Sequence, residues 1–432
     1  MKDEASRPTF STGWGLVLAT AGLAIGLGNI WRFPYMMGKY GGCVFLLIYV
    51  ALVIAFGVPG LMVECALGRH TRRGPMGAYA AVSMPGGRVI GGLLVLTVLM
   101  AASYYGIVLA WVLFCATSFA IAGALGSEPA SFAAFRESFS GQMVLVFVTA
   151  GLGCLAVAAG VRRGIQQLST WGLPLFFGLF VILIVRVLSL DGAMEGLRAF
   201  LRPRPADLSG ATVLAAMGQA FFSLGLGGTF MVVYGSYMRR EDSIPRTAFA
   251  TAAADLAAAL MAGLIVVPAV IAMGLDLDTG YSLLFEVMPA VFGQMPAGNL
   301  FGAVFFFSVF LVGLLSLIAA YEVLVAAAAD SLGWRRWRSA RLILALQLAL
   351  AVPGLFIGSY IKYSDLIWGT TMQPLGSALA VVALAWCVGR ARALQEIARS
   401  GDLAVPRFFF YWIKYVMPLG IAAMLIYGWL SW

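Results

Sequence analysis

Apolar residues occur along this chain in long blocks. Residues 41–67, 89–123 and 299–329 are three of them, and each exceeds the ~20 residues that cross a ~30 Å hydrocarbon core as a helix. Cutting the sequence at charged and Gly/Pro-rich breaks predicts eleven membrane spans. These spans are 10–37, 42–69, 87–123, 141–160, 164–190, 211–238, 243–275, 299–331, 340–359, 363–393 and 407–430. The pattern predicts an all-α polytopic membrane protein.

Composition supports this interpretation. Of the 432 residues, 62% are hydrophobic and 11% are charged, whereas an average soluble protein carries about 25% charged residues. A soluble enzyme of this length would need a charged surface that this chain lacks. The apolar spans also contain no nucleophile–base pair, metal cluster or phosphate loop, so we expect no enzyme. The net charge of +9 comes from loops between spans, so we expect no nucleic-acid partner.

Arginine clusters predict the orientation in the membrane. They recur in alternate loops, at Arg69, Arg72, Arg73 and Arg88, at Arg162 and Arg163, at Arg239, Arg240 and Arg246, at Arg335, Arg336, Arg338 and Arg341, and at Arg390, Arg392 and Arg399. The positive-inside rule makes this side cytoplasmic. The amino terminus is then inside, and the odd span count puts the carboxyl terminus at Trp432 outside. The arginine-containing segment 186–210 is the exception, and we expect an external loop there.

Two spans contain glycine clusters where a helix can unwind. Span one contains AGLAIGLGN (21–29) and span six contains SLGLGG (223–228). Glycine tolerates non-helical torsions, and unwound backbone at membrane depth lines a cavity. Matching breaks five helices apart are typical of an inverted-repeat transporter whose site lies between them. The alternative is that these glycines only allow close helix packing. Polar Asn29 and Ser223 beside the two clusters favour a site.

The same segments resemble a known family. GLAIGLGNIWRFPY (22–35) and GQAFFSLGLG (218–227) resemble the first- and sixth-helix signatures of the neurotransmitter:sodium symporter family, whose bacterial members have the LeuT fold. VPRFFFYWIKYV (405–416) matches the eleventh helix, and Gly164 with Pro174 matches the fifth. The resemblance implies a LeuT-like 5+5 inverted repeat plus one extra helix. Its divisions are a single transporter domain over 1–432, a first repeat over 10–190, a second over 211–393 and an eleventh helix over 407–430.

The resemblance implies a first sodium site. Its ligands are the substrate carboxylate, the carbonyl of Ala24, the side chain of Asn29, Ser223 and Asp255. Asp255 interrupts the apolar stretch 251–268, and an intramembrane carboxylate is costly and therefore functional by default. The alternative is a structural hydrogen bond to a neighbouring helix. Animal relatives bind chloride at positions matching Tyr49, Gln219 and Ser223. Because Asp255 supplies a fixed negative charge there, we expect no chloride requirement.

A second sodium site is less complete. Its ligands match the carbonyls of Gly22, Ile25 and Val312 and the hydroxyl of Ser316. The neighbouring ligand position, usually Thr or Asp, is Leu315. A leucine methyl cannot coordinate sodium, so the site is weakened, filled by water or lost. The resemblance leaves the sodium stoichiometry open.

The first-helix break suits a substrate carboxylate, because it offers backbone N–H groups and a half-helix dipole. Gly26 stands where amine-selective relatives carry Asp, which favours an amino acid over an amine. Tyr105 would bond the carboxylate, and the carbonyls of Ala24, Phe222 and Ser223 would receive the ammonium. The expected pocket comprises Gly26, Gly28, Ala101, Phe222, Gly225, Gly228, Ser316 and Ala320.

Several of these pocket residues are smaller than their counterparts in leucine-binding relatives. Empty space beside a bound substrate loses dispersion contacts, so the pocket favours a bulky apolar or aromatic amino acid. The alternative is that Met100, Thr229 or Phe230 folds into the gap.

The resemblance also implies two gates and a support. The outer gate is Arg32 with Asp365, above an aromatic lid of Tyr105 and Phe222. The inner gate is Arg7 with Asp330, supported by Ser236 and Tyr237. Glu64 in the second span is expected to brace the first-helix break by accepting backbone N–H bonds.

Together these features predict a sodium-coupled amino-acid symporter of the bacterial inner membrane that works by alternating access. Its partners are an amino acid, Na⁺ and the lipid bilayer, and it is a monomer or homodimer. One alternative is a proton-coupled or sodium-independent amino-acid transporter or exchanger. Another is an amino-acid sensor that does not transport.

Overall fold

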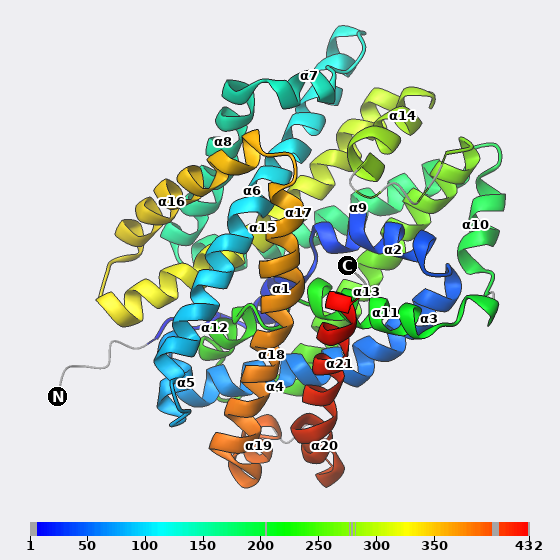
Figure 1. Cartoon of the computed structure of the whole chain (residues 1–432). Coiled ribbons are helices and arrows are strands. Elements are labelled where there is room, and N and C mark those ends of the chain that lie inside the picture. The colour runs from blue at the N-terminus through cyan, green and yellow to red at the C-terminus, as the bar shows by residue number, and fades with distance from the viewer. Residues whose placement is uncertain are drawn as a thin grey trace.

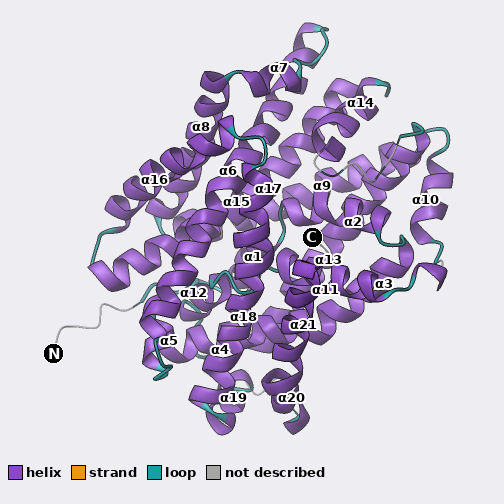
Figure 2. Cartoon of the chain, in the orientation of Figure 1, coloured by secondary structure: helices purple, strands orange, loops and turns teal. Residues whose placement is uncertain are grey.

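The computed structural model describes residues 7–203, 205–275, 277, 280, 282–399 and 406–430. This part of the chain is helical and contains no strand (Figures 1 and 2). The α-helices are α1 (Gly13–Ala24), α2 (Phe33–Lys39), α3 (Cys43–Leu52), α4 (Val58–Thr71), α5 (Pro75–Ala81), α6 (Gly87–Leu125), α7 (Phe132–Glu137), α8 (Phe139–Ala159), α9 (Gln167–Leu188), α10 (Ala193–Leu201), α11 (Gly210–Ser223), α12 (Phe230–Ser236), α13 (Ile244–Ala272), α14 (Met288–Gly293), α15 (Gly298–Leu332), α16 (Arg336–Phe356), α17 (Tyr360–Ser364), α18 (Gln373–Val382), α19 (Arg390–Ile397), α20 (Arg407–Tyr411) and α21 (Met417–Leu430).

Short helical segments of other geometry join several of these helices. The π-helical segments are η1 (Gly28–Arg32), η2 (Val53–Gly57), η3 (Val161–Gln166), η5 (Leu283–Val287), η6 (Asp365–Met372), η7 (Ala383–Val388) and η8 (Trp412–Val416), and η4 (Pro205–Asp207) is a 3₁₀ turn. They continue a neighbouring α-helix in most places, so one membrane span often carries several labels.

Nine helices of the described residues are long and apolar enough to span a membrane. A tenth span is the bent pair Gly13–Ala24 and Gly28–Lys39, whose halves meet at 54°. The predicted sixth span, 211–238, is divided between α11 and α12, and neither piece crosses a membrane by itself. The count of eleven spans therefore stays a prediction. The repeat boundaries also stay predictions. The predicted external position of the carboxyl terminus concerns Trp432, which lies outside the described residues.

The interrupted first span lies inside the bundle. α1 contacts α13, α9 and α15, and α15 packs along α6, the longest helix of the structure. Figure 1 shows α1 in the middle of the molecule, with α7 and α14 near one end and α19 and α20 near the other. Protein therefore surrounds the unwound backbone, as an interruption at membrane depth requires.

Glycines bring α4 and α12 into backbone contact. A Cβ on Gly68 of α4 would lie 2.0 Å from the carbonyl oxygen of Val232. A Cβ on Gly235 of α12 would lie 2.5 Å from the carbonyl oxygen of Cys65. Larger residues at either position would push the helices apart, so the small residues allow this packing.

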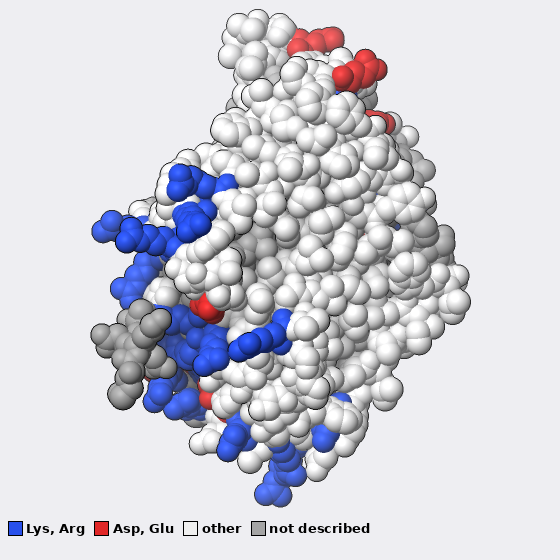
Figure 3. Space-filling model, turned by 60° about the vertical axis from the view of Figure 1, so that its left-hand side comes forward, with Lys and Arg blue, Asp and Glu red and all other residues white. Residues whose placement is uncertain are grey.

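Lys and Arg side chains gather toward one end of the molecule. Figure 3 shows Lys and Arg gathered toward one end, with some Asp and Glu among them, while the opposite end carries Asp and Glu. This distribution agrees with the arginine clusters seen in the sequence. The assignment of the basic end to the cytoplasm stays a prediction.

Candidate functional site

The break after α1 exposes backbone groups in the protein interior. α1 ends at Ala24, Ile25 is extended (φ −74°, ψ 117°), and helix resumes at Gly28. Because α1 ends at Ala24, no following turn of this helix supplies an N–H to the Ala24 carbonyl. The N–H of Gly26 donates to Oδ1 of Asn29 at 2.9 Å. The break thus places the Ala24 carbonyl at the end of α1 and bonds the Gly26 N–H to a polar side chain.

The break between α11 and α12 depends on left-handed backbone. Gly225, Gly227 and Thr229 have φ angles of 61°, 86° and 57°, a region that glycine enters readily. A Cβ on Gly227 would lie 1.5 Å from the carbonyl oxygen of Gln373 at the start of α18. The loop and α18 therefore touch through backbone, and this contact requires glycine.

Glu64 of α4 supports this second break. Its Oε1 accepts the N–H of Gly227 at 2.7 Å. The prediction that Glu64 braces the first-helix break is wrong about the location. Because α4 packs against α12, a carboxylate projecting from α4 reaches the α11–α12 loop. Its role as a backbone acceptor matches the sequence argument.

Asp255, Asn29 and Ser223 meet in the protein interior from α13, η1 and α11. The side-chain nitrogen of Asn29 lies 2.7 Å from Oδ1 of Asp255 and 3.0 Å from Oγ of Ser223. Ser223 donates to the same carboxylate oxygen at 2.8 Å, and the Tyr49 hydroxyl donates to the other at 3.0 Å. All four side chains are buried. The cluster concentrates oxygen ligands and one acidic group beside the first-helix break.

A second polar group faces α1 from α15. Oγ of Ser316 lies 3.0 Å from the carbonyl oxygen of Ile25 and 3.4 Å from that of Val312. The fourth expected ligand, Gly22, has one polar and one hydrocarbon neighbour. A Cβ on Gly22 would lie 3.1 Å from Oγ of Ser169 and 3.2 Å from a methyl of Leu315. Three oxygens of the expected second sodium site are thus together, and a leucine side chain lies beside the fourth position.

A cavity opens between the two breaks. Its volume is about 90 Å³, measured as the space open to the centre of a water molecule. One water needs roughly 10–15 Å³ on this measure, so the cavity has room for roughly six to nine waters. Most of the predicted pocket residues line it: Ala24, Gly26, Gly28, Ala101, Tyr105, Phe222, Ser223, Gly225, Ser316 and Ala320.

Gly228 is the predicted pocket residue that the cavity does not reach. The ring of Phe230 lies against it and lines the cavity in its place. The sequence argument named Phe230 only as an alternative. It also missed Val98, Leu317 and Gln373, which line the cavity. Val98 and Leu317 carry no polar or glycine signal, and the amide of Gln373 is the one signal that could have been used.

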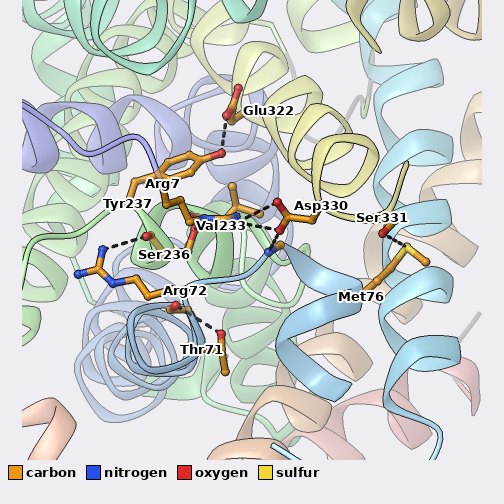
Figure 4. Close-up of polar contacts among 12 residues, drawn as sticks. Arg7, Thr71, Arg72, Met76, Val233, Ser236, Tyr237, Glu322, Asp330 and Ser331 are labelled. Carbon is orange, nitrogen blue, oxygen red and sulfur yellow. Dashed lines mark hydrogen bonds and ion pairs between the residues drawn. The ribbon is translucent and has the colours of Figure 1, made fainter. Parts of the chain in front are cut away.

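The inner gate residues are in contact. Nη1 of Arg7 lies 3.0 and 2.8 Å from the two carboxylate oxygens of Asp330, and Nε donates to Oγ of Ser236 at 2.8 Å. The Arg7 guanidinium also lies 5.2 Å from the ring centre of Tyr237. Figure 4 shows these side chains with Glu322, which accepts from the Tyr237 hydroxyl at 2.6 Å. The predicted inner residues form one network.

Glu322 and its partner Arg336 were missed by the sequence argument. Nη1 of Arg336 donates to Oε1 of Glu322 at 3.0 Å. Glu322 is a buried carboxylate in the apolar helix α15. It carries the same signal that identified Asp255, so applying that criterion throughout the chain would have found it.

The outer gate residues are not paired. Among the described residues, no ion pair joins Arg32 to Asp365. The Arg32 guanidinium lies 4.3 Å from the ring centre of Phe222, and Asp365 accepts from the Tyr104 hydroxyl at 2.9 Å. Tyr105 lines the cavity near Gly26. With the inner network formed and the outer pair apart, the arrangement is closed at the inner gate and not latched at the outer one.

Comparison with known proteins identifies the family. The sequence matches the family described as the sodium:neurotransmitter symporter family over residues 7–126 and 137–432. The chain belongs to this family. It is 33% identical to the uncharacterized sodium-dependent transporter YhdH of Bacillus subtilis, over 94% of each chain. It is 25% identical to an uncharacterized sodium-dependent transporter of Haemophilus influenzae, over 97% of this chain and 98% of that one.

A solved structure has the same fold. The crystal structure of MhsT in complex with L-phenylalanine superposes with a TM-score of 0.88 at 28% identity, covering 98% of this chain and all of that chain. This likeness confirms the all-α, LeuT-like fold class with its two interrupted helices. The family consists of transporters rather than enzymes, and the apolar helices make this a multi-pass membrane protein. The chain is thus a sodium-dependent symporter.

Proposed function

We propose that this protein imports an apolar or aromatic amino acid together with sodium. The observation that carries the proposal is the buried cluster of Asp255, Asn29 and Ser223 beside a cavity that both helix breaks line. A cation in the membrane interior needs several oxygens to replace its hydration shell, and unwound backbone with a carboxylate supplies them. The cluster and the cavity share Ser223, so ion and substrate would touch.

The first sodium would be held by Asp255, Ser223, the side-chain oxygen of Asn29 and the carbonyl of Ala24. The substrate carboxylate would complete its coordination. Each ligand then stabilises the other, and the two affinities must change by the same factor. This shared contact is the physical basis of the coupling between sodium and amino acid.

The substrate's charged groups have matching partners at the breaks. The carboxylate would accept from the Tyr105 hydroxyl and from backbone N–H groups at the start of η1, and the ammonium would donate to carbonyls of Ala24 and Phe222. Gly26 has no acidic side chain that could replace the substrate carboxylate, which supports an amino acid rather than an amine. The L-phenylalanine bound to the related MhsT supports the same class.

We propose a coupling of one sodium per substrate. Leu315 stands where the second site needs an oxygen, and its methyl lies against Gly22. An apolar side chain at that position both lacks a ligand and takes space from an ion. Ser316 would keep the local structure by its bond to the Ile25 carbonyl.

We propose that chloride is not required. Asp255 accepts from Tyr49 and Ser223, two of the three positions where animal relatives bind chloride. The third, Gln219, donates instead to the carbonyl of Gly28 at 2.9 Å. A fixed carboxylate at this point supplies the negative charge that balances sodium.

Transport would proceed by alternate opening of two weak latches. The Arg7–Asp330 pair holds the inner side, and Arg32 with Asp365 would close the outer side over the bound substrate. Exposed or partly exposed ion pairs contribute about 1 kcal/mol or less, so either latch opens easily. The inner-membrane location, the cytoplasmic amino terminus and the monomeric or dimeric state belong to the same proposal.

Uptake into proteoliposomes tests the proposal. We expect labelled leucine or phenylalanine to accumulate when an inward sodium gradient is imposed, and not when choline replaces sodium. Competition by the other amino acids then ranks the substrates, with glycine a weak competitor. Binding of an amino acid without accumulation would indicate a sensor, and accumulation in choline would indicate coupling to another ion.

A further inference from the structure

The ring of Phe230 lies over two glycines of the α11–α12 break. A Cβ on Gly228 would lie 2.1 Å from Cε2 of this ring, and a Cβ on Gly225 would lie 3.3 Å from Cδ2. The Phe230 side chain is only 9% exposed and lines the cavity. The space that the two glycines leave open is therefore filled by an aromatic ring from the start of α12.

The intervening residue is held in a strained conformation. Thr229 has a φ of 57°, which β-branched residues rarely adopt. Its buried hydroxyl has no hydrogen-bond partner among the described residues. Such strain persists only where the surrounding structure requires it, and it concentrates at binding sites. The left-handed turn at Thr229 lets the chain double back, so the Phe230 ring returns over Gly228.

The cavity that the ring lines is bounded mainly by apolar side chains. The lining includes Val98, Ala101, Leu317 and Ala320, and none of the described residues that line the cavity is charged. A charged substrate side chain would lose its hydration here and gain no partner. An apolar side chain would instead pack on the face of the Phe230 ring.

We propose that Phe230 sets the size limit of the substrate side chain. This inference rests on the proposed function and names the residue that determines its specificity. The glycines at 225 and 228 do not enlarge the substrate site directly. They leave the space that the Phe230 ring occupies. Removing the ring opens the volume of a phenyl group beside the substrate, so the preference moves toward larger side chains.

A cycle of variants tests the inference. It comprises the wild type, Gly228→Ala, Phe230→Ala and the double variant. Gly178→Ala is the control, because a Cβ there meets nothing within 4 Å. Inhibition constants for leucine, phenylalanine and tryptophan are measured against a labelled amino acid in sodium, and the melting temperature of each purified variant is recorded without substrate.

Gly228→Ala should weaken binding about tenfold or more, the scale of one misplaced methyl group in an apolar pocket. In the Phe230→Ala background the same substitution should change binding less than about threefold, because its collision partner is gone. Phe230→Ala should favour tryptophan over leucine relative to the wild type, and the melting temperatures should show the same non-additivity. Gly178→Ala should resemble the wild type.

Equal effects of Gly228→Ala in both backgrounds, or an unchanged ranking of the three amino acids in Phe230→Ala, would overturn the inference and leave the proposed function intact. A wild-type protein that binds no amino acid with sodium would overturn both. The substrate-free melting temperatures report the ring–glycine contact even for a variant that no longer binds, so additive melting temperatures would also contradict the inference.

Discussion

The side-chain nitrogen of Asn29 lies 2.7 Å from Oδ1 of Asp255, although 226 positions separate the two residues. Asn29 belongs to the interrupted first span and Asp255 to α13. Burying an unpaired carboxylate is costly, and here Asn29, Ser223 and Tyr49 all donate to it. This contact ties the unwound backbone to the fixed charge on which sodium coupling depends.

Replacement of the carboxylate should create a chloride requirement. Removing one partner of a buried charge pair costs about 3–5 kcal/mol, so uptake by Asp255→Ser in gluconate should fall more than about a hundredfold. Chloride should restore part of it, because Tyr49, Gln219 and Ser223 remain to hold an anion. Uptake in paired gluconate and chloride buffers measures this. Wild-type uptake that itself depends on chloride would contradict the prediction.

The identity of residue 315 should determine the sodium stoichiometry. Leu315→Thr supplies a hydroxyl next to Ser316 and on the side that faces Gly22, so the sodium dependence of uptake should become cooperative. We expect a Hill coefficient of about 1 for the wild type and a value approaching about 2 for the variant. Leu314→Thr is the matched control and should resemble the wild type. A wild-type coefficient near about 2 would instead indicate a working second site.

Loss of the inner latch should shift the protein toward the inward-open state. Arg7 and Asp330 are partly exposed, at 15% and 27% of their side-chain areas, so the pair contributes about 1 kcal/mol or less. Arg7→Ala should raise the sodium concentration for half-maximal binding by about fivefold at most. The sodium concentration for half-maximal binding of Arg7→Lys should lie between those of the wild type and Arg7→Ala. Lysine keeps the charge but lacks the planar fork that contacts Asp330 and Ser236 together. Unchanged sodium affinity in Arg7→Ala would argue against a latch.

Glu64 should stabilise the sixth-span break through its bond to Gly227. Glu64→Ala leaves a buried N–H without an acceptor, which costs about 1–3 kcal/mol of unfolding free energy. Glu64→Gln keeps a carbonyl oxygen and should retain most of the stability. Thermal unfolding in detergent compares the two variants. Equal melting temperatures for Glu64→Ala and Glu64→Gln would show that the bond contributes little.

Much of the site could be predicted because its chemistry is unusual for a membrane interior. Glycine clusters and single polar residues such as Asn29 and Asp255 are rare in apolar spans, so their positions marked both breaks and the ion cluster. Leu315 is identified as a departure on another ground, because the resemblance to the family implies an oxygen-bearing residue at that position.

Other features depend on packing between distant helices, which local pattern does not encode. Glu64 reaches Gly227 because α4 packs on α12, a contact set by Gly68 and Gly235 in three dimensions. Phe230 covers Gly228 because Thr229 adopts a left-handed turn. Neither relationship produces a periodic signal, and a phenylalanine in an apolar span is ordinary. The pairing state of Arg32 and Asp365 depends on conformation and is likewise absent from the sequence.

Mutual enhancement of binding tests the central claim most directly. The dissociation constant of leucine or phenylalanine is measured by isothermal titration at increasing sodium, and that of sodium at increasing amino acid. If both ligands meet at Ser223 and Asp255, saturating sodium should lower the dissociation constant of the amino acid at least about tenfold. The amino acid should lower the dissociation constant of sodium by the same factor. Amino-acid affinity that is the same in sodium and in choline would contradict the account.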